Sequence, residues 1–348
     1  MPNKSVLVAM SGGVDSAAAA LLLQKNGYDI QGITMQLFSD NNSTDENSFQ
    51  AKAIADKLGF KHTSVELYSC FRENVIVPFI EDYKNGKTPN PCIECNKKLK
   101  FGKLFEIASQ EGFNFLATGH YARIEKASTG EFLLKKATDE KKDQSYFLWS
   151  LKKEILPRIL LPLGTFTKED IRALARENGF SNADKGDSQD ICFIPDGDYT
   201  AFLEKNGNID FKQGNFIDLS GNILGKHNGL ERYTIGQRKG LGIALGKPMF
   251  VGEKNAADNT VTLCDDAELY KTTLAAHSAN FVAVERLSAP TRLMAKIRYR
   301  HTPAWATVTQ TSDSTFEVIF DLPQRAIAKG QSVVLYDGDT VVGGGIIE

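Results

Sequence analysis

The sequence predicts an α/β protein in three parts: a doubly wound parallel sheet, a small central β-rich domain and a C-terminal β-barrel. In the first two hundred residues, short apolar runs alternate with stretches of helical periodicity, which is typical of a parallel sheet covered by helices. After Phe202, glycines and short β-rich runs replace this alternation. From Thr272 onwards, short strands separated by turns dominate, as in a small barrel. We therefore predict domains at residues 1–203, 204–271 and 272–348.

Composition limits the class of protein. A chain of 348 residues is long enough for two or three domains, and 42% hydrophobic with 24% charged residues is typical of globular proteins. The formal net charge is only −2, so a nucleic-acid partner would have to bind local basic patches. No apolar run is long enough to span a membrane and no signal-like segment precedes the first strand, so we expect a cytoplasmic protein with no membrane partner.

The first predicted strand, Val6–Met10, leads through the loop Ser11–Ser16 (SGGVDS) into a helix that begins at Ala17. Backbone N–H groups in such a turn and at a helix N-terminus form a site suited to phosphate. The two glycines allow close approach of the backbone and unusual φ values, and the two serines add hydroxyl donors. We expect Asp15 either to cap the helix or to hold Mg²⁺.

This loop lacks the lysine of a Walker loop and resembles the SGGxDS loop of the N-type ATP pyrophosphatases. That resemblance implies a domain that binds ATP with Mg²⁺, adenylates a carbonyl oxygen and releases pyrophosphate. Strands at Asp29–Leu37 and His62–Glu66 and the apolar run Phe113–Leu116 complete the predicted sheet. Sites on such sheets lie at the carboxyl ends of strands, which suggests Met35 beneath an adenine ring, although a core methionine is the commoner case. The expected nucleotide contacts are Ala9, Met10, Ser11, Gly12, Gly13, Val14, Asp15, Ser16, Met35 and Gly119.

Three cysteines stand in distinctive contexts. Cys92 and Cys95 have C-x-x-C spacing within Thr88–Asn96 (TPNPCIECN), which suits a redox pair, half of a metal site or a thiolate nucleophile with a neighbour. Cys192 lies in Asp187–Ile194 (DSQDICFI), and alone it would be a buried structural cysteine. Lysines surround the C-x-x-C pair and would lower a thiol pKa and attract phosphates; they are Lys84, Lys87, Lys97, Lys98, Lys100 and Lys103.

The remaining two cysteines, Cys70 and Cys264, have no such setting. We predict that both are structural, with Cys70 on an amphipathic helix and Cys264 on a strand.

The C-terminal third predicts a hairpin at Ser220–Asn222, a basic loop at Tyr233–Gly242 and then the barrel. Alternation along a strand would place Lys296, Arg298 and Arg300 on one side, as a basic face for a phosphate backbone. The alternative is an edge strand that charges protect from aggregation. The predicted barrel strands are Leu293–Tyr299, Ala306–Thr309, Thr315–Phe320, Ser332–Tyr336 and Thr340–Ile347.

The combination of motifs resembles the bacterial tRNA-specific 2-thiouridylases. In order, the motifs are Ser11–Ser16, Thr88–Asn96, Ala117–Arg123 (ATGHYAR), Lys142–Leu148 (KDQSYFL), Asp187–Ile194 and Tyr233–Gly242 (YTIGQRKGLG), and the resemblance continues to Gly343–Ile346 (GGGI). It therefore covers nearly the whole chain. It implies an enzyme that replaces the C2 oxygen of uridine 34, the tRNA wobble base, with sulfur. Transfer of AMP would turn that oxygen into a good leaving group, and a cysteine persulfide would bring the sulfur.

Carried over residue by residue, the resemblance implies a persulfide on Cys192 and a partner thiol on Cys95 that frees the sulfur by forming a disulfide. Many family members have Asp at the position of Cys92. Cys92 is therefore either an accessory residue or, together with the other two, a ligand of a [4Fe–4S] cluster. The persulfide and cluster mechanisms are alternatives, and we favour the persulfide.

The resemblance also implies partners: tRNAs that accept lysine, glutamate and glutamine, and a cysteine desulfurase or relay protein as sulfur donor. The tRNA contacts that it implies are Asn90, Pro91, Cys92, His120, Lys142, Asp143, Gln144, Arg298, Tyr299 and Gln331. Two rival functions remain. A small-molecule ATP pyrophosphatase would leave the cysteines and the basic barrel unexplained, and a tRNA-binding protein without catalysis would leave the loop and the cysteines unexplained.

Overall fold

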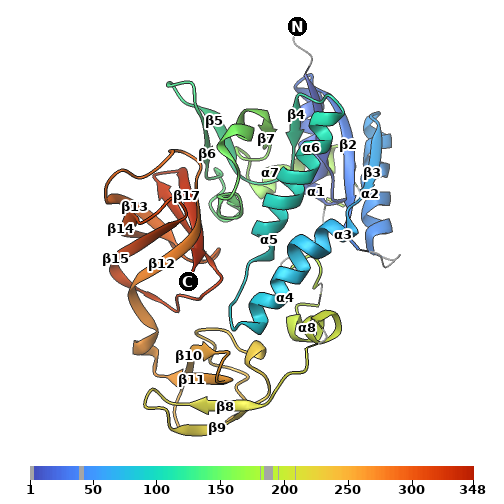
Figure 1. The fold of residues 1–348 in the computed structure, drawn as a ribbon. Helices are drawn as coiled ribbons and strands as arrows, with labels where there is room; N and C mark the ends of the chain where they lie inside the picture. The colour runs from blue at the N-terminus through green and yellow to red at the C-terminus, as the bar shows by residue number, and fades with distance from the viewer. Residues whose placement is uncertain (1–3, 39–42, 181, 184–190, 195, 208) are drawn as a thin grey trace.

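Three β-sheets organise the molecule (Figure 1). The computed structural model describes residues 4–38, 43–180, 182–183, 191–194, 196–207 and 209–348. Residues 187–190 of the DSQDICFI motif therefore lie outside the described part of the chain. In Figure 1 the parallel sheet is at the upper right, the barrel at the left and the central sheet at the bottom. Among the described residues, no helix combines the length and the apolar character needed to cross a bilayer.

The first sheet is parallel and has the order β3-β2-β1-β4-β7, as expected for a doubly wound fold. Its strands are β1 (Ser5–Ala9), β2 (Asp29–Gln36), β3 (His62–Glu66), β4 (Phe115–Ala117) and β7 (Ile159–Leu160). Alternate residues of β1 face opposite sides: Val6 and Val8 pack against α1, α2 and α7, and Leu7 packs against α6. These helices are α1 (Val14–Lys25), α2 (Ser43–Leu58), α6 (Leu104–Gln110) and α7 (Lys168–Glu177). The chain reverses its winding between β1 and β4, so the loops after these two strands adjoin.

A helical segment links β3 to β4 and carries the C-x-x-C pair (Figure 1). It consists of α3 (Tyr68–Phe71), the π-helix η1 (Arg72–Ile76), α4 (Val77–Lys84), α5 (Pro91–Glu94) and the π-helix η2 (Cys95–Lys103). A Cβ on Gly102 would lie 2.9 Å from the carbonyl oxygen of Lys97, so glycine is needed for this backbone to close up. Further short helices are η3 (Ser145–Phe147), η4 (Lys153–Arg158) and α8 (Tyr199–Gly207).

The central sheet has the order β10-β11-β8-β9 around a small core that includes Phe216, Val251 and Leu263. The predicted hairpin joins β8 to β9, with Gly221 at φ +85° in the turn. The elements of this region are β8 (Gly214–Ile217), β9 (Ile223–His227), η5 (Leu230–Arg232), β10 (Phe250–Asn255), β11 (Thr260–Cys264) and η6 (Asp266–Leu269).

The C-terminal strands form a closed antiparallel barrel in the order β12-β15-β14-β13-β16-β17, closed by pairing between β12 and β17. The strands are β12 (Tyr270–Phe281), β13 (Thr291–Lys296), β14 (Ala304–Gln310), β15 (Thr315–Arg325), β16 (Ser332–Asp337) and β17 (Thr340–Ile347). The predicted strand Leu293–Tyr299 is too long at its end. Strand β13 ends at Lys296. Arg298 and Arg300 lie beyond its end, so they do not share a strand face with Lys296. That part of the prediction is wrong.

A hairpin from the first part of the chain extends the barrel sheet. Its strands, β5 (Arg123–Lys126) and β6 (Phe132–Lys135), follow the ATGHYAR motif, and β6 pairs with β17 through Lys135 and Thr340. The parallel-sheet part and the barrel are thus joined by sheet pairing, which fixes the side of the barrel that faces the SGGVDS loop.

Candidate functional site

The SGGVDS loop is a closed, internally bonded turn between β1 and α1. Gly12 adopts φ +73°, and a Cβ there would lie 2.6 Å from the carbonyl oxygen of Asn47. Gly13 is the N-cap of α1 and has an ordinary extended backbone. The buried Ser16 hydroxyl donates to the Gly13 carbonyl at 3.0 Å and accepts from the Ser11 N–H at 3.2 Å. The loop is therefore held by its own hydrogen bonds, and Ser11 and Gly13 remain accessible to an anion.

Asp15 does not cap α1, and its carboxylate is bonded to two side chains from other parts of the chain. The N-cap of α1 makes no side-chain hydrogen bond. The Asp15 carboxylate accepts from the Lys168 ammonium at 2.7 and 2.8 Å, one contact to each oxygen, and from the Tyr121 hydroxyl at 2.8 Å. The helix-cap interpretation of Asp15 is therefore wrong.

Two predicted nucleotide contacts lie at the ends of β2 and β4, the strands on either side of β1. Gly119 follows β4, and a Cβ there would lie 2.8 Å from the backbone of Asp15 and Ser16. Its lack of a side chain lets the β4 loop pack against the nucleotide loop. Met35, near the end of β2, is half-buried and packs against two hydrophobic clusters. Ala9 and Met10 are at the end of β1, and Met10 is buried in the core.

A cleft of about 1270 Å³ connects the nucleotide loop to the barrel. Ser11, Gly13, Val14 and Asp15 line one end, and Cys192 also lines it. The KDQSYFL segment contributes Lys142, Asp143 and Gln144, and the barrel side contributes Met294, Lys296, Tyr299, Arg300 and His301. The structure thus brings nucleotide-loop, cysteine and barrel residues, widely separated in sequence, into one cavity.

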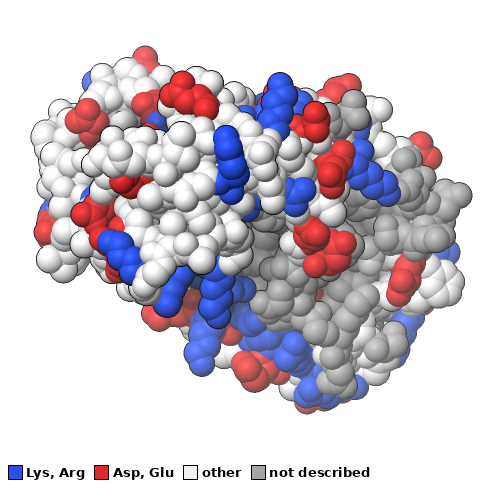
Figure 2. Space-filling model, turned by 90° about the horizontal axis from the view of Figure 1, so that it is seen from below, with Lys and Arg blue, Asp and Glu red and all other residues white. Residues whose placement is uncertain are grey.

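Lysine and arginine side chains outnumber acids in the cleft lining. The basic residues there are Arg123, Lys136, Lys141, Lys142, Lys168, Lys296 and Arg300, and the acids are Asp15, Glu140, Asp143 and Asp339. The molecular surface seen from below shows blue side chains gathered in its lower middle, with red side chains among them (Figure 2). A chain with almost no net charge therefore presents a locally basic cavity, as a phosphate-rich ligand requires.

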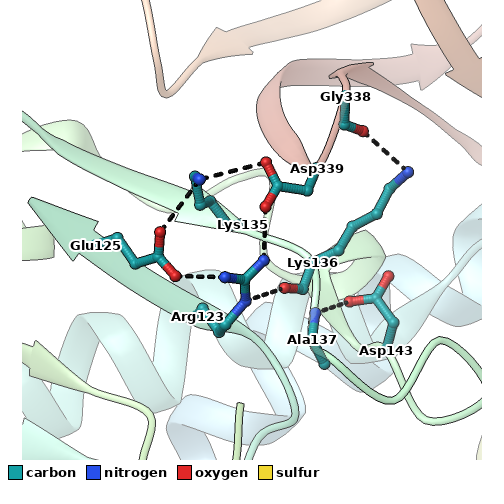
Figure 3. Close-up of polar contacts among 8 residues, drawn as sticks. All are labelled: Arg123, Glu125, Lys135, Lys136, Ala137, Asp143, Gly338 and Asp339. Carbon is teal, nitrogen blue, oxygen red and sulfur yellow. Dashed lines mark hydrogen bonds and ion pairs between the residues drawn. The ribbon is translucent and has the colours of Figure 1, made fainter. Parts of the chain in front are cut away.

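Ion pairs fasten the β5–β6 hairpin to the barrel at the edge of the cleft (Figure 3). Arg123 contacts Glu125 and donates to Asp339 at 2.6 Å, and Lys135 lies 3.1 Å from Glu125 and 3.3 Å from Asp339. Lys136 donates to the Gly338 carbonyl at 3.2 Å. Positive and negative side chains alternate in this network, and together they hold the two walls of the cleft in place. An isolated, exposed ion pair would contribute little stabilisation.

The C-x-x-C pair begins a helix beside the barrel. The Asn90 side chain accepts from the Cys92 N–H at 3.2 Å and caps α5, and Pro91 occupies the first helical position. Cys95 is buried at the start of η2, Cys92 is half-buried and Cys192 is exposed. All five cysteines are reduced in this structure.

The three motif thiols share one electrostatic environment. Burial raises the pKa of Cys92 and of Cys95, and the nearby Lys100 ammonium lowers both. The surrounding protein, together with the neighbouring Cys95 and Cys92, raises the pKa of Cys192 to about 12, although its side chain remains in contact with solvent, and Lys100 opposes this rise. At neutral pH these groups are thiols, and Lys100 is the cation that opposes their protonation.

The three motif cysteines are candidate ligands of a metal cluster. No three His, Cys, Asp or Glu side chains in the described ranges converge closely enough to hold a metal ion. Cys92, Cys95 and Cys192 are therefore not arranged as a ligand set in this structure.

The predicted tRNA positions divide into two groups. Lys142, Asp143, Gln144 and Tyr299 line the main cleft. Asp143 is buried and accepts from the N–H groups of Ala137 and Ser145, so it shapes the cleft wall. His120 is buried behind the cleft, bonded to Thr118 at 2.7 Å, and desolvation holds the pKa of its imidazole well below the usual range. It is therefore neutral at physiological pH.

The other group lies where the barrel meets the C-x-x-C segment. The Gln331 side chain donates to the Thr88 carbonyl at 2.8 Å, which places it beside Asn90 and Pro91. Arg298 is half-buried and donates to the carbonyls of Ile235 and Ala326 at 3.2 and 2.7 Å. It thus ties the basic loop of the central domain to the barrel.

Comparison with known proteins identifies the family. Three family models match in succession: "tRNA methyl transferase HUP domain" at residues 4–196, "tRNA methyl transferase PRC-barrel domain" at 200–265 and "Aminomethyltransferase beta-barrel domain" at 271–347. A tRNA-specific 2-thiouridylase MnmA from Clostridioides difficile is 48% identical over 99% of this chain and 98% of that protein. Another, from Acetivibrio thermocellus, is 46% identical over the full length of both chains. The chain belongs to the tRNA-specific 2-thiouridylase family.

Solved structures resemble this family member only in part. A predicted subunit of tRNA methyltransferase from Methanocaldococcus jannaschii is 25% identical, with a TM-score of 0.34, over 50% of this chain and 74% of that one. A 4-thiouridine synthetase in complex with RNA and ATP is 17% identical, with a TM-score of 0.35, over 58% of this chain and 50% of that one. TM-scores this low carry no weight in assigning the site.

Two residues that hold Asp15 in this family member were not predicted from the sequence. Lys168 and Tyr121 hold Asp15, yet both lie far from it in sequence. Cys70 is half-buried on α3 and packs against the hydrophobic cluster that contains Cys95, where it raises the pKa of the Cys95 thiol. The lysine-rich composition near the C-x-x-C pair pointed to the right region but not to Lys100 in particular.

Proposed function

We propose that the chain is a tRNA 2-thiouridylase that converts uridine 34 of tRNA to 2-thiouridine at the expense of ATP. The observation that carries this proposal is the single cleft lined by the SGGVDS loop, Cys192 and Tyr299 of the barrel side. An activated nucleotide, a sulfur carrier and an RNA-binding surface are the three parts that the reaction requires. Belonging to the 2-thiouridylase family supports the same reading.

The first step is adenylation. The backbone N–H groups around Gly13 and the positive end of α1 would bind the triphosphate, and Mg²⁺ bound with ATP would neutralise further phosphate charge. The C2 oxygen of the base attacks the α-phosphorus and pyrophosphate leaves. The expected nucleotide contacts are those predicted from the sequence, from Ala9 to Ser16 together with Met35 and Gly119.

The second step is sulfur transfer. The outer sulfur of a Cys192 persulfide attacks C2, and AMP leaves with the original oxygen. The Cys95 thiolate then attacks the Cys192 Sγ, and the electron pair of the broken S–S bond stays on the sulfur attached to C2. The products are 2-thiouridine and a Cys95–Cys192 disulfide, which an external thiol must reduce before the next turnover.

The partners follow from this chemistry. A cysteine desulfurase or a relay protein would load Cys192, which is the accessible one of the three motif cysteines. We propose that the tRNA contacts Lys142, Asp143, Gln144 and Tyr299 in the cleft, and that the target base approaches Asn90, Pro91 and Cys92 beside His120 and Gln331. Such a base must leave its stack to reach the site. We further propose a cytoplasmic enzyme that acts on lysine, glutamate and glutamine tRNAs, divided at residues 203 and 271.

The proposal is tested by measuring AMP and pyrophosphate formed from ATP with and without tRNA, together with 2-thiouridine. A thiouridylase forms all three only when tRNA is present. Pyrophosphate release without tRNA would favour a small-molecule ATP pyrophosphatase, and tRNA binding with no ATP turnover would favour a binding protein.

The choice between persulfide and cluster is tested with Cys92→Asp, purified aerobically and free of detectable iron. Near-normal 2-thiouridine per enzyme supports the persulfide route, in which Cys92 is accessory. No product without iron, with recovery after anaerobic reconstitution, would contradict it.

A further inference from the structure

The Asp15 carboxylate poses an electrostatic problem for a nucleotide site. It lines the cleft beside Ser11, Gly13 and Val14, whose backbone forms the anion-binding turn. A carboxylate at this place would repel the phosphates that the turn attracts, because two like charges a few ångströms apart in a partly desolvated site cost appreciable free energy.

The positive charge that offsets the Asp15 carboxylate comes from Lys168, on another helix. It is the first residue of α7, directly after the capping residue Thr167, and only 3% of it is exposed. Its ammonium reaches both Asp15 oxygens, at 2.7 and 2.8 Å. The Tyr121 hydroxyl adds a third contact to the same carboxylate at 2.8 Å. A buried lysine is expensive to desolvate, so its placement against Asp15 at the cleft wall calls for a specific partner.

The backbone that carries Asp15 and Lys168 is fixed by helix packing and hydrogen bonds. The α1 and α7 helices pack through the same hydrophobic cluster, which includes Ala19, Ile171 and Ala175. The Lys168 N–H is held by Asp139 at 3.1 Å, and the Thr167 capping box fixes the start of α7. The helix framework therefore delivers the ammonium to Asp15 before any ligand arrives.

We propose that Lys168 is the resident counter-ion of Asp15 and a positioning residue for ATP. It cancels the carboxylate charge at the phosphate site, and Asp15 acts as an ion-paired anchor of the loop rather than as a Mg²⁺ ligand. This inference rests on the proposed ATP-binding role of the SGGVDS loop and extends it to residues outside the loop.

The test is a double-mutant cycle on ATP affinity in the full-length chain, measured by calorimetry without tRNA so that no turnover occurs. The variants are Lys168→Met, Asp15→Asn and the double variant, each measured with Mg²⁺ and again with EDTA. Lys168→Met leaves an uncompensated carboxylate, so we expect ATP affinity to fall at least about tenfold. Asp15→Asn should bind MgATP at least as tightly as the wild type, and the double variant should recover most of the affinity that Lys168→Met loses.

Several results would overturn the proposal. A double variant as weak as Lys168→Met would mean that Lys168 binds phosphate itself. Weak binding by Asp15→Asn in Mg²⁺ but not in EDTA would make Asp15 a Mg²⁺ ligand. A lower melting temperature with unchanged ATP affinity in Lys168→Met would make the pair purely structural.

Controls separate this inference from the proposed function. Lys247→Met removes a lysine that pairs with Asp265 and does not line the cleft, and it should leave ATP affinity unchanged. If Lys168→Met fails to fold, the ATP affinities of Asp15→Asn and of the double variant are compared, because neither variant contains an unpaired carboxylate. Equal affinities support the counter-ion role, and weaker binding by the double variant means that Lys168 binds phosphate itself. Failure of the wild-type chain to bind ATP would overturn the ATP-binding role of the loop and the inference with it, whereas wild-type binding that Lys168→Met leaves intact overturns only the inference.

Discussion

The nucleotide loop and the cysteine region differ in how far each is organised for its chemistry. The loop is closed by hydrogen bonds within Ser11–Ser16, and Lys168 already pairs with Asp15. In the cysteine region, Cys95 is buried, Cys192 is exposed, and neither is bonded to the other. Burial raises the pKa of Cys92 and Cys95, the surrounding protein and these two neighbours raise the pKa of Cys192, and Lys100 opposes all three shifts.

This difference suggests how the two steps are separated. A nucleotide site gains from being rigid before its ligand arrives, because preorganised donors need no rearrangement. A sulfur carrier that was a thiolate at all times would react with any oxidant or electrophile. If Cys192 is the sulfur carrier, as we propose, a raised thiol pKa would protect it until a sulfur donor arrives.

The largest effect is expected for Cys192→Ser. This variant should form no detectable 2-thiouridine, because serine cannot carry a persulfide, while tRNA and ATP affinities stay unchanged. The measurement is nucleoside analysis of tRNA after reaction with ATP and a sulfur source. Cys264→Ser, on strand β11 of the central domain, is the matched control and should remain active; product from Cys192→Ser would remove this residue from the mechanism.

Gly12→Val should weaken ATP binding at least about tenfold. A side chain at φ +73° is strained by about 1–3 kcal/mol, and its Cβ would meet the Asn47 carbonyl at 2.6 Å, so the loop must change shape. The check is ATP affinity by calorimetry, with tRNA affinity as the control that the rest of the chain is folded. Gly27→Ala is a useful comparison, since Gly27 also has a positive φ but a Cβ there meets no atom within 4 Å.

Lys100→Met should slow alkylation of Cys192 at a given pH, by less than about tenfold, because the thiol pKa rises when the cation is removed. In the wild type, labelling should accelerate steadily from neutral to alkaline pH, since the pKa of Cys192 is about 12 and the thiolate fraction grows throughout that range. Peptide mass spectrometry after iodoacetamide treatment resolves each cysteine. Lys98→Met, an exposed lysine on the same helix, should leave the rate unchanged; an equal change in both variants would refute a specific role for Lys100.

The smallest effect distinguishes two arginines that the sequence placed together. Arg298→Ala should lower the free energy of unfolding by about 1–3 kcal/mol, because two carbonyls lose a charged donor. It should leave the salt dependence of tRNA binding unchanged. Arg300→Ala, which lines the cleft, should instead reduce the log–log salt slope by about one unit. The opposite pattern would mean that Arg298 contacts the RNA phosphates.

The sequence predicted the parts of the site that are local in the chain. The strand–loop–helix at Ser11 and the α/β-then-barrel order follow from periodicity and turn residues, and the structure confirms them. Lys168 could not be predicted, because it lies 153 residues from Asp15 and its role depends on how α7 packs. The same holds for the contact of Gln331 with Thr88, which spans 243 residues.

Two further features depended on backbone geometry. The π-helical turns of η2 have no recognised residue pattern, so the positions of Cys95 and Lys100 on it could not be derived from helical spacing. The end of β13 at Lys296 was missed because charges continue past the strand with the same alternation. Alternation alone does not show where hydrogen bonding to a neighbouring strand stops.

We propose that adenylation and sulfur transfer use separate parts of one cleft, so that either step can be removed without the other. Pyrophosphate release from ATP by Cys192→Ser in the presence of substrate tRNA tests it most directly. We predict tRNA-dependent release of pyrophosphate close to one equivalent per enzyme-bound tRNA, with no 2-thiouridine, while Gly12→Val releases much less at an ATP concentration that just saturates the wild type. Loss of pyrophosphate release in Cys192→Ser, with ATP and tRNA still bound, would contradict the claim.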